Sequence, residues 1–277
     1  MAKRGRPKGS GASGGEGAGS VQALDRALDL MRTIAAGEGL TLTAIAARTG
    51  LAPSSVHRLL STLAAHGFVE ADPIDQTWAI GVEAFRVGQG FQRRHKAALV
   101  GRPVMRELME ATGETANLGI FEGDEVVFIA QVESTEPIRA FFRAGERRSA
   151  HASGIGKALL AEMPAATVDR VVRTKGLPAY TPSTLTDPVR LAAELTAIRA
   201  RGFAIDDEER NRGMRCIAAA IFDENGEAVA GLSISGPSGR MSAERVAELG
   251  PVVADAAARI TAAIGGAGPR RTTTSGR

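Results

Sequence analysis

The chain has 277 residues, of which 44% are apolar and 23% are charged, and its formal net charge is +3 at pH 7. This length predicts two ordinary domains with hydrophobic cores. Membrane proteins are disfavoured because no apolar run approaches the ~20 residues of a membrane span. Secreted proteins are disfavoured because the basic N-terminus lacks the apolar stretch of a secretory signal. Disulfide-bonded proteins are disfavoured because the single cysteine excludes an internal disulfide. We expect a soluble, cytoplasmic protein that does not contact a membrane.

Positive charge is concentrated at the two ends of the chain. Residues 1–19 hold four basic side chains among Gly, Ser and Ala, and residues 265–277 hold three arginines among Gly and Thr. Segments of this composition bury too little apolar surface to fold alone, so both ends are predicted to be disordered. Because acidic residues outnumber basic ones over 99–264, the basic ends indicate either a polyanionic partner or simply solvated termini.

Residues 20–81 have the pattern of a helix-turn-helix followed by a hairpin. A second helix is predicted from Thr41 to Gly50, and Pro53 fits the first turn of a third helix that ends at Gly67. The strands that follow, 68–71 and 76–80, flank a turn in the position of a wing. The first helix is predicted to bury one apolar face made of Val21, Leu24, Ala27, Leu28, Met31, Ile34 and Ala35.

The exposed face of the third helix is short, polar and basic. Its hydroxyls suit phosphate oxygens, and Arg58 suits a guanine edge or a phosphate. The alternative is a small α+β domain without a role in DNA binding. The side chains predicted to face DNA are Ser54, Ser55, His57, Arg58, Ser61 and Thr62.

Residues 82–98 are predicted to form a connecting helix, weakened by two glycines. Phe85 and Phe91 lie on it, and apolar rings of this size are seldom left in water by chance. The basic run Arg93-Arg94-His95-Lys96 suits either DNA phosphates or a solvated helix end.

Residues 99–264 alternate between helical and strand patterns, as in an α/β sensor domain. Asn225-Gly226 between two apolar runs is a strong hairpin signal. The predicted helices are 99–111, one opening at 154, 165–173, 188–201 and 242–264, and the predicted strands are 115–121, 126–132, 138–143, 218–223 and 228–235.

The stretch Gly154-Ile-Gly-Lys157 resembles a nucleotide-binding loop only superficially. Such a loop needs a glycine where His151 stands and a Ser or Thr where Ala158 stands. What remains is a helix start whose free N–H groups suit one small anion, or a helix start that is merely packed. No cofactor is expected, and the four histidines have no metal-ligand spacing, so no metal is expected either.

Four segments together resemble the IclR family of bacterial transcription regulators: ALDRALDLMRTIA, LTLTAIAARTGLAPSSVHRLLSTLAAHGFVE, HASGIGKALLA and DDEERNRGMRCIAAAIFDENGEAVAGLSISGP. The resemblance implies a mixed α/β protein with an N-terminal winged helix-turn-helix over 20–81, an intersubunit linker helix over 82–98 and a C-terminal GAF-like effector-binding domain over 99–264. It also implies binding to double-stranded operator DNA as a homodimer or homotetramer, because one short recognition helix reads too few base pairs alone.

Family members that bind small oxoacids hold the carboxylate at the start of the helix that opens at 154. Carried over position by position, the resemblance implies a ligand site of Gly154, Ile155, Asp206, Cys216, Ser233 and Ser235. The two serines share one strand face. An ionised Asp206 beside a carboxylate is unfavourable, so a bridging group or a proton is required.

The segment IRAFFRAGERRSAHASGIGKALLA is similar to members that sense glyoxylate or related small acids. We therefore expect glyoxylate as effector, with pyruvate or another small organic or aromatic acid as the alternative. Ala140 stands where the family often has a long apolar side chain, which leaves the width of the pocket open.

Two further hypotheses concern catalysis and the N-terminal arm. Cys216 with His151, or Ser153 with a base, would make an enzyme, but no catalytic motif surrounds them and the neighbourhood of the cysteine is apolar, so we expect no enzyme. A DNA-compacting protein would leave the acidic second domain without a role. Arg4-Gly5-Arg6-Pro7 resembles an AT-hook core, in which Arg4 and Arg6 enter an A·T-rich minor groove; the alternative is non-specific attraction to phosphates.

Overall fold

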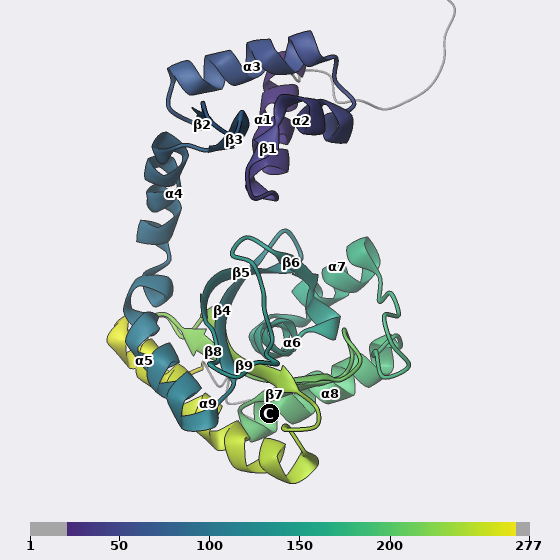
Figure 1. Cartoon of the computed structure of the whole chain (residues 1–277). Helices are drawn as coiled ribbons and strands as arrows, with labels where there is room; N and C mark the ends of the chain where they lie inside the picture. Colours follow the sequence, from purple (N-terminus) through teal and green to yellow (C-terminus); the bar gives the residue numbers. More distant parts are fainter. Residues whose placement is uncertain (1–20, 270–277) are drawn as a thin grey trace, which may run out of the picture. The chain divides into compact units, whose positions relative to one another are not determined.

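A computed structural model describes residues 21–269 of the chain. The chain divides into two compact units, Met1–Phe91 and Gln92–Arg277, which are described separately (Figure 1). The whole predicted basic arm, including Arg4 and Arg6, and the last eight residues of the predicted tail lie outside the described residues.

The first unit is a helix-turn-helix with a hairpin wing. A three-stranded sheet in the order β1-β3-β2 accompanies its helices. Its elements are α1 Gln22–Ala35, β1 Leu40–Thr41, α2 Leu42–Thr49, α3 Pro53–Ala65, β2 Val69–Asp72 and β3 Thr77–Ile80.

Local chemistry sets the boundaries of the two helices of this motif. The Thr41 hydroxyl accepts a hydrogen bond from the Ala44 N–H at 3.3 Å, and Gly50 ends α2 with a left-handed φ of 67°. Helix α3 starts at Pro53 in its first turn, after Ala52, whose side chain offers no cap. The helix-turn-helix and the wing predicted from the sequence are confirmed.

The predicted inward face of α1 is partly wrong. Leu30 and Ile34 are the buried residues of this helix, whereas Leu24 is 57% exposed and Leu28 is 42% exposed. Apolar residues occupy a wide arc of α1, and α2 and α3 pack only against the part that contains Leu30 and Ile34. An apolar stripe that begins at Val21 therefore remains open in the single chain.

Two helices follow the wing. Helix α4 runs over Val82–Arg94 and has no buried residue; Phe85 is 63% exposed. Helix α5 runs over Lys96–Thr112, so it begins inside the predicted connector.

The second unit is built on a six-stranded antiparallel sheet in the order β6-β5-β4-β9-β8-β7. The mixed α/β class predicted from the sequence is confirmed. After α5 its elements are β4 Thr115–Glu122, β5 Glu125–Val132, β6 Arg147–Ser149, a 3₁₀ turn Ala150–Ala152, α6 Gly154–Glu162, α7 Ala165–Lys175, α8 Pro188–Arg201, β7 Ala204–Asp207, β8 Met214–Phe222, β9 Ala228–Pro237 and α9 Ala243–Ala263.

The sheet curls around α6, while α5 and α9 pack together on its outer face (Figure 1). Helix α6 is buried along nearly its whole length, so both faces of the sheet are covered. Close packing on the outer face depends on Gly101, since a Cβ there would lie 3.2 Å from Ile260 and 3.5 Å from Leu118.

Three strand predictions in this unit need correction. Residues 138–143 form no strand, because their backbone bonds to side chains and to a loop: the Thr115 hydroxyl donates to the Ala140 carbonyl at 2.9 Å. The sequence also missed the two short edge strands: β6, which pairs with β5, and β7, which pairs with β8.

The end of the described chain stays close to the sheet. Past α9, the Gly266 N–H donates to the Thr261 carbonyl and the Ala267 N–H donates to the Asp223 carbonyl. Within residues 21–269, no helix combines the length and the apolar character that a membrane crossing requires.

Candidate functional site

The start of α6 lies directly against strand β8. The Ser153 hydroxyl caps this helix by accepting from the Gly156 N–H at 3.3 Å. A Cβ on Gly154 would stand 3.3 Å from the Cβ atoms of both Cys216 and Ala218. The glycine therefore allows the first N–H groups of α6 to approach the sheet closely.

Polar side chains form two rows across the face of the sheet that meets this helix. Strand register pairs Asp206 with Cys216, Cys216 with Ser235, and Ser235 with Thr115. Two residues further along, Ser233 and Asn117 pair in the same way. Because cross-strand partners and residues two apart share a face, these side chains lie together.

Hydrogen bonds connect the two rows. The Ser235 hydroxyl donates to the Cys216 sulfur at 3.0 Å, and the Asn117 amide donates to the Ser235 oxygen at 3.3 Å. The side-chain amides of Gln131 and Asn117 lie 2.9 Å apart, within hydrogen-bonding distance. A connected polar network therefore crosses this face of the sheet.

A cavity of about 20 Å³ lies where the first row meets the start of α6. The Phe128 and Phe142 rings form one wall, stacked at 4.6 Å between centroids. The lining comprises Phe128, Phe142, Arg148, Ala152, Ser153, Asp206, Arg210, Asn211, Met214 and Cys216.

Two of the six sequence-predicted ligand residues line this cavity, and three more lie near those two along the sheet and the helix start. Asp206 and Cys216 line it, Gly154 and Ser235 contact Cys216, and Ser233 lies one row further along the sheet. The sixth, Ile155, points its buried side chain toward Gly119 and Gly231, so only its backbone N–H belongs to the helix start.

Sequence reasoning missed the aromatic wall and the two arginines at the cavity. Phe142 and Phe128 fill space beside Ala140, which is fully buried. The Arg148 guanidinium pairs with Glu146, and the Arg210 guanidinium lies over the Tyr180 ring. No spacing in the sequence placed either arginine beside the cavity.

Burial governs the electrostatics of the cavity. It raises the pKa of Asp206, against the opposing effects of the Glu209 N–H, which donates to that carboxylate at 2.8 Å, and of the charge on Lys157. Burial also raises the pKa of the Cys216 thiol, which opposes thiolate formation. His151 bonds through Nε2 to the Pro178 carbonyl at 3.1 Å. These partners argue against the alternative of an enzyme that uses Cys216 with His151.

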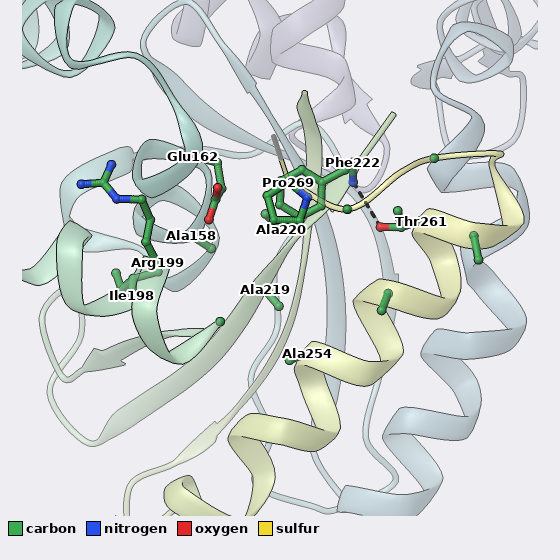
Figure 2. A pocket seen from close by; sticks show the side chains of 15 residues that line it. Ala158, Glu162, Ile198, Arg199, Ala219, Ala220, Phe222, Ala254, Thr261 and Pro269 are labelled. Atoms are coloured by element: carbon green, nitrogen blue, oxygen red, sulfur yellow. Dashed lines mark hydrogen bonds between the residues drawn. The ribbon is translucent and has the colours of Figure 1, made fainter. Parts of the chain in front are cut away.

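A wider cavity of about 340 Å³ lies elsewhere in this unit, lined by residues of α6, α8, β8 and α9 that include several alanines (Figure 2). Its polar groups are committed to the fold: the Arg199 guanidinium donates to the Ala161 carbonyl, and the Thr261 hydroxyl accepts from the Phe222 N–H at 3.1 Å. Both groups therefore hold secondary structure in place at this wider cavity.

The predicted DNA-facing residues share the outer side of α3. Ser54, His57 and Arg58 are exposed, and Ser55 is half-buried. Ser61 and Thr62 are exposed as well, and their hydroxyls donate to the carbonyls of His57 and Arg58. Val56 and Leu60 are fully buried on the opposite side, so packing fixes which face of the helix is presented.

Residues 21–269 contain no group of three His, Cys, Asp or Glu side chains placed to hold a metal ion.

A winged helix-turn-helix combined with a separate α/β unit that encloses a polar cavity defines a ligand-responsive, DNA-binding transcription regulator. Residues 23–73 match the IclR helix-turn-helix domain, and residues 92–262 match the bacterial transcriptional regulator IclR C-terminal domain. The chain belongs to the IclR family, whose members bind operator DNA and small-molecule effectors.

Relatives support the assignment over nearly the whole chain. The HTH-type transcriptional regulator BhcR of Paracoccus denitrificans is 53% identical over 260 residues, covering 94% of this chain and 93% of the relative. The crystal structure of Thermotoga maritima IclR matches with a TM-score of 0.77 at 29% identity, covering 88% of this chain and 99% of that chain. An IclR homolog from Microbacterium hydrocarbonoxydans, complexed with 4-hydroxybenzoate, matches with a TM-score of 0.76 at 25% identity, covering 87% and 98%.

Proposed function

We propose that this regulator senses a small carboxylate, glyoxylate, in the cavity between the start of α6 and strand β8. The observation that carries the proposal is the close approach of Gly154 to Cys216, beside a cavity lined by Asp206. This close approach places the N–H groups at the start of α6 opposite the polar row of Asp206, Cys216 and Ser235.

In this arrangement the ligand carboxylate accepts hydrogen bonds from the N–H groups of Gly154 and Ile155, where the helix dipole favours an anion. Asp206 bonds to the other end of the ligand through a hydrate hydroxyl or a shared proton. Cys216, Ser233 and Ser235 form the opposite wall, and a hydrogen bond from the Ser235 hydroxyl to the Cys216 sulfur holds those two side chains in place.

The cavity must widen to admit any of these acids, and a two-carbon acid requires the least widening. About 20 Å³ is room for one water molecule, whereas a cavity that accepts a benzene ring measures about 150 Å³. Binding of 4-hydroxybenzoate, the ligand held by one relative, would therefore need more space than this chain offers beside the stacked rings of Phe128 and Phe142. Pyruvate, one methyl group larger than glyoxylate, is the alternative.

On the DNA side, the exposed face of α3 reads the operator. We propose that two or four copies of the chain assemble, since α1 and α4 expose apolar side chains such as Leu24 and Phe85. Glyoxylate then changes the spacing of paired DNA-binding units by binding their competent and incompetent arrangements with different affinity. The basic N-terminal arm with Arg4 and Arg6 is proposed as an accessory DNA contact.

Calorimetric titration of the purified protein with a panel of acids tests the ligand. The panel holds glyoxylate, pyruvate, C3 and C4 dicarboxylates and 4-hydroxybenzoate, and glyoxylate is expected to bind most tightly. Preferential binding of 4-hydroxybenzoate would contradict the volume argument. Chemical conversion of an acid by the protein, rather than binding alone, would support the alternative hypothesis of an enzyme.

A further inference from the structure

Lys157 on α6 is among the largest fully buried side chains of the second unit, with 1% of its side chain exposed. A buried ammonium group is costly unless it is paired and hydrogen-bonded. Its position on α6 is three residues after Gly154, the first residue of that helix.

Both polar partners of the Lys157 ammonium flank Asp206. Its Nζ donates to the Ile205 carbonyl at 2.5 Å and forms a short ion pair with Oε1 of Glu209. The contacts therefore reach the chain one residue before Asp206 and three residues after it. The Asp206 carboxylate itself accepts from the Glu209 N–H at 2.8 Å, which closes a tight turn between the two anchoring points.

The far side of this turn is tied down as well. The Thr181 hydroxyl donates to the Glu208 carbonyl, and the Thr184 hydroxyl donates to the Glu209 carbonyl, each at 2.6 Å. Backbone contacts of this kind hold the turn but do not connect it to α6. Lys157 supplies a direct hydrogen-bonded link between the helix that receives the ligand carboxylate and the turn that carries Asp206.

We propose that Lys157, through its pair with Glu209, is a positioning residue of the ligand site: it sets the distance between the α6 N–H groups and the Asp206 carboxylate. The inference rests on the proposed ligand site, which it deepens. Neither Lys157 nor Glu209 lines the cavity, so the pair acts through Asp206 rather than by touching the ligand.

An apolar replacement of the whole pair separates positioning from stability. K157M alone leaves Glu209 buried and unpaired and is expected to melt at a lower temperature. The double variant K157M/E209L removes both charges, and it also removes Oε2 of Glu209, which is buried without a hydrogen-bond partner among the described residues. Apolar replacement of a buried ion pair is often neutral or stabilising, so the double variant is expected to melt near the wild type.

The double variant is nevertheless expected to bind glyoxylate about tenfold more weakly or worse, the effect of a misplaced charge-assisted hydrogen bond. The control D124N/R170M removes another cross-element pair, joined at 2.8 Å and outside the cavity, and keeps the wild-type Kd. In a D206A background, removal of the Lys157–Glu209 pair should not raise the Kd for glyoxylate further, because the effects of residues that act through one another do not add. A wild-type Kd in K157M/E209L, or a full additional loss in D206A, overturns the inference.

Amide hydrogen exchange gives a second readout that needs no ligand. The N–H of residue 209, which donates to Asp206 in the wild type, is expected to exchange faster in K157M/E209L than in the wild type or in D124N/R170M. If no acid of the panel binds the wild-type protein, the proposed function fails, and unchanged exchange at residue 209 would then overturn the positioning role separately.

Discussion

Binding of glyoxylate is expected to take up a proton at Asp206, so that affinity falls as pH rises. Burial already raises the pKa of this carboxyl group, and the ligand brings a second negative charge beside it. Two unit charges 4 Å apart repel by about 4 kcal/mol at an effective dielectric constant of about 20. That is comparable to the whole binding free energy of a millimolar ligand, about −4.1 kcal/mol. Protonation removes this repulsion.

The sign and the size of the pH dependence follow from linkage. If each ligand takes up one proton, Kd rises up to tenfold for each pH unit above the pKa of Asp206 in the free protein. The charged groups that act on Asp206 are Lys157, Asp207 and Glu209, with the Arg210 N–H as a hydrogen-bond donor. Glu209 needs its own control, since burial raises its pKa to about 7.

Calorimetry between pH 6 and 8.5, in buffers of different ionisation enthalpy, measures both Kd and the proton taken up. D206N should bind without pH dependence, because its side-chain oxygen still accepts from the Glu209 N–H and the titrating charge is gone. E209Q should keep most of the pH dependence of the Kd for glyoxylate. A flat profile in the wild type would refute the reasoning and favour an ionised Asp206 that acts through a bridging hydroxyl.

Three further predictions concern DNA binding and its control. Arg58→Ala is expected to weaken specific operator binding by about 1–3 kcal/mol in anisotropy titrations. Arg32 is an exposed arginine of α1 that pairs with Asp29, and Arg32→Ala should change operator affinity little. Equal effects of the two substitutions would mean that the recognition face is misplaced. Ser235→Ala combined with Asp206→Ala should abolish the response to ligand and leave operator affinity intact, and a double variant that still responds normally to glyoxylate would contradict the site. Deletion of residues 1–19 should weaken binding equally on A·T-rich and G·C-rich flanks if the arm acts by charge alone, and selectively on A·T-rich flanks if Arg4 and Arg6 read the minor groove.

Local sequence patterns predicted most elements of the fold because their causes are local. Pro53 and Gly50 mark the helix-turn-helix, and Asn225-Gly226 lies in the turn between β8 and β9. Strand β7 was missed because its four residues run into an acidic stretch that is typical of a loop, and pairing with β8 makes it a strand. Residues 138–143 alternate like a strand, yet the Ala140 carbonyl accepts a hydrogen bond from the Thr115 hydroxyl and not from the backbone of a neighbouring strand.

The site was less predictable than the fold. Family resemblance supplied Gly154, Asp206 and Cys216, but only strand register shows that Asp206, Cys216 and Ser235 form one row. The burial of Lys157 is invisible in a helical segment where lysine is a common exposed residue. Its role depends on a turn about fifty positions away, and no spacing rule connects the two.

Titration of the protein onto DNA from its own upstream region, with and without glyoxylate, tests the central claim most directly. We expect a specific gel-shift that requires Arg58. Glyoxylate should change the operator affinity of the wild type but not that of the Ser235→Ala, Asp206→Ala double variant. Specific DNA binding that no acid of the C2–C4 panel alters would contradict the proposed ligand site.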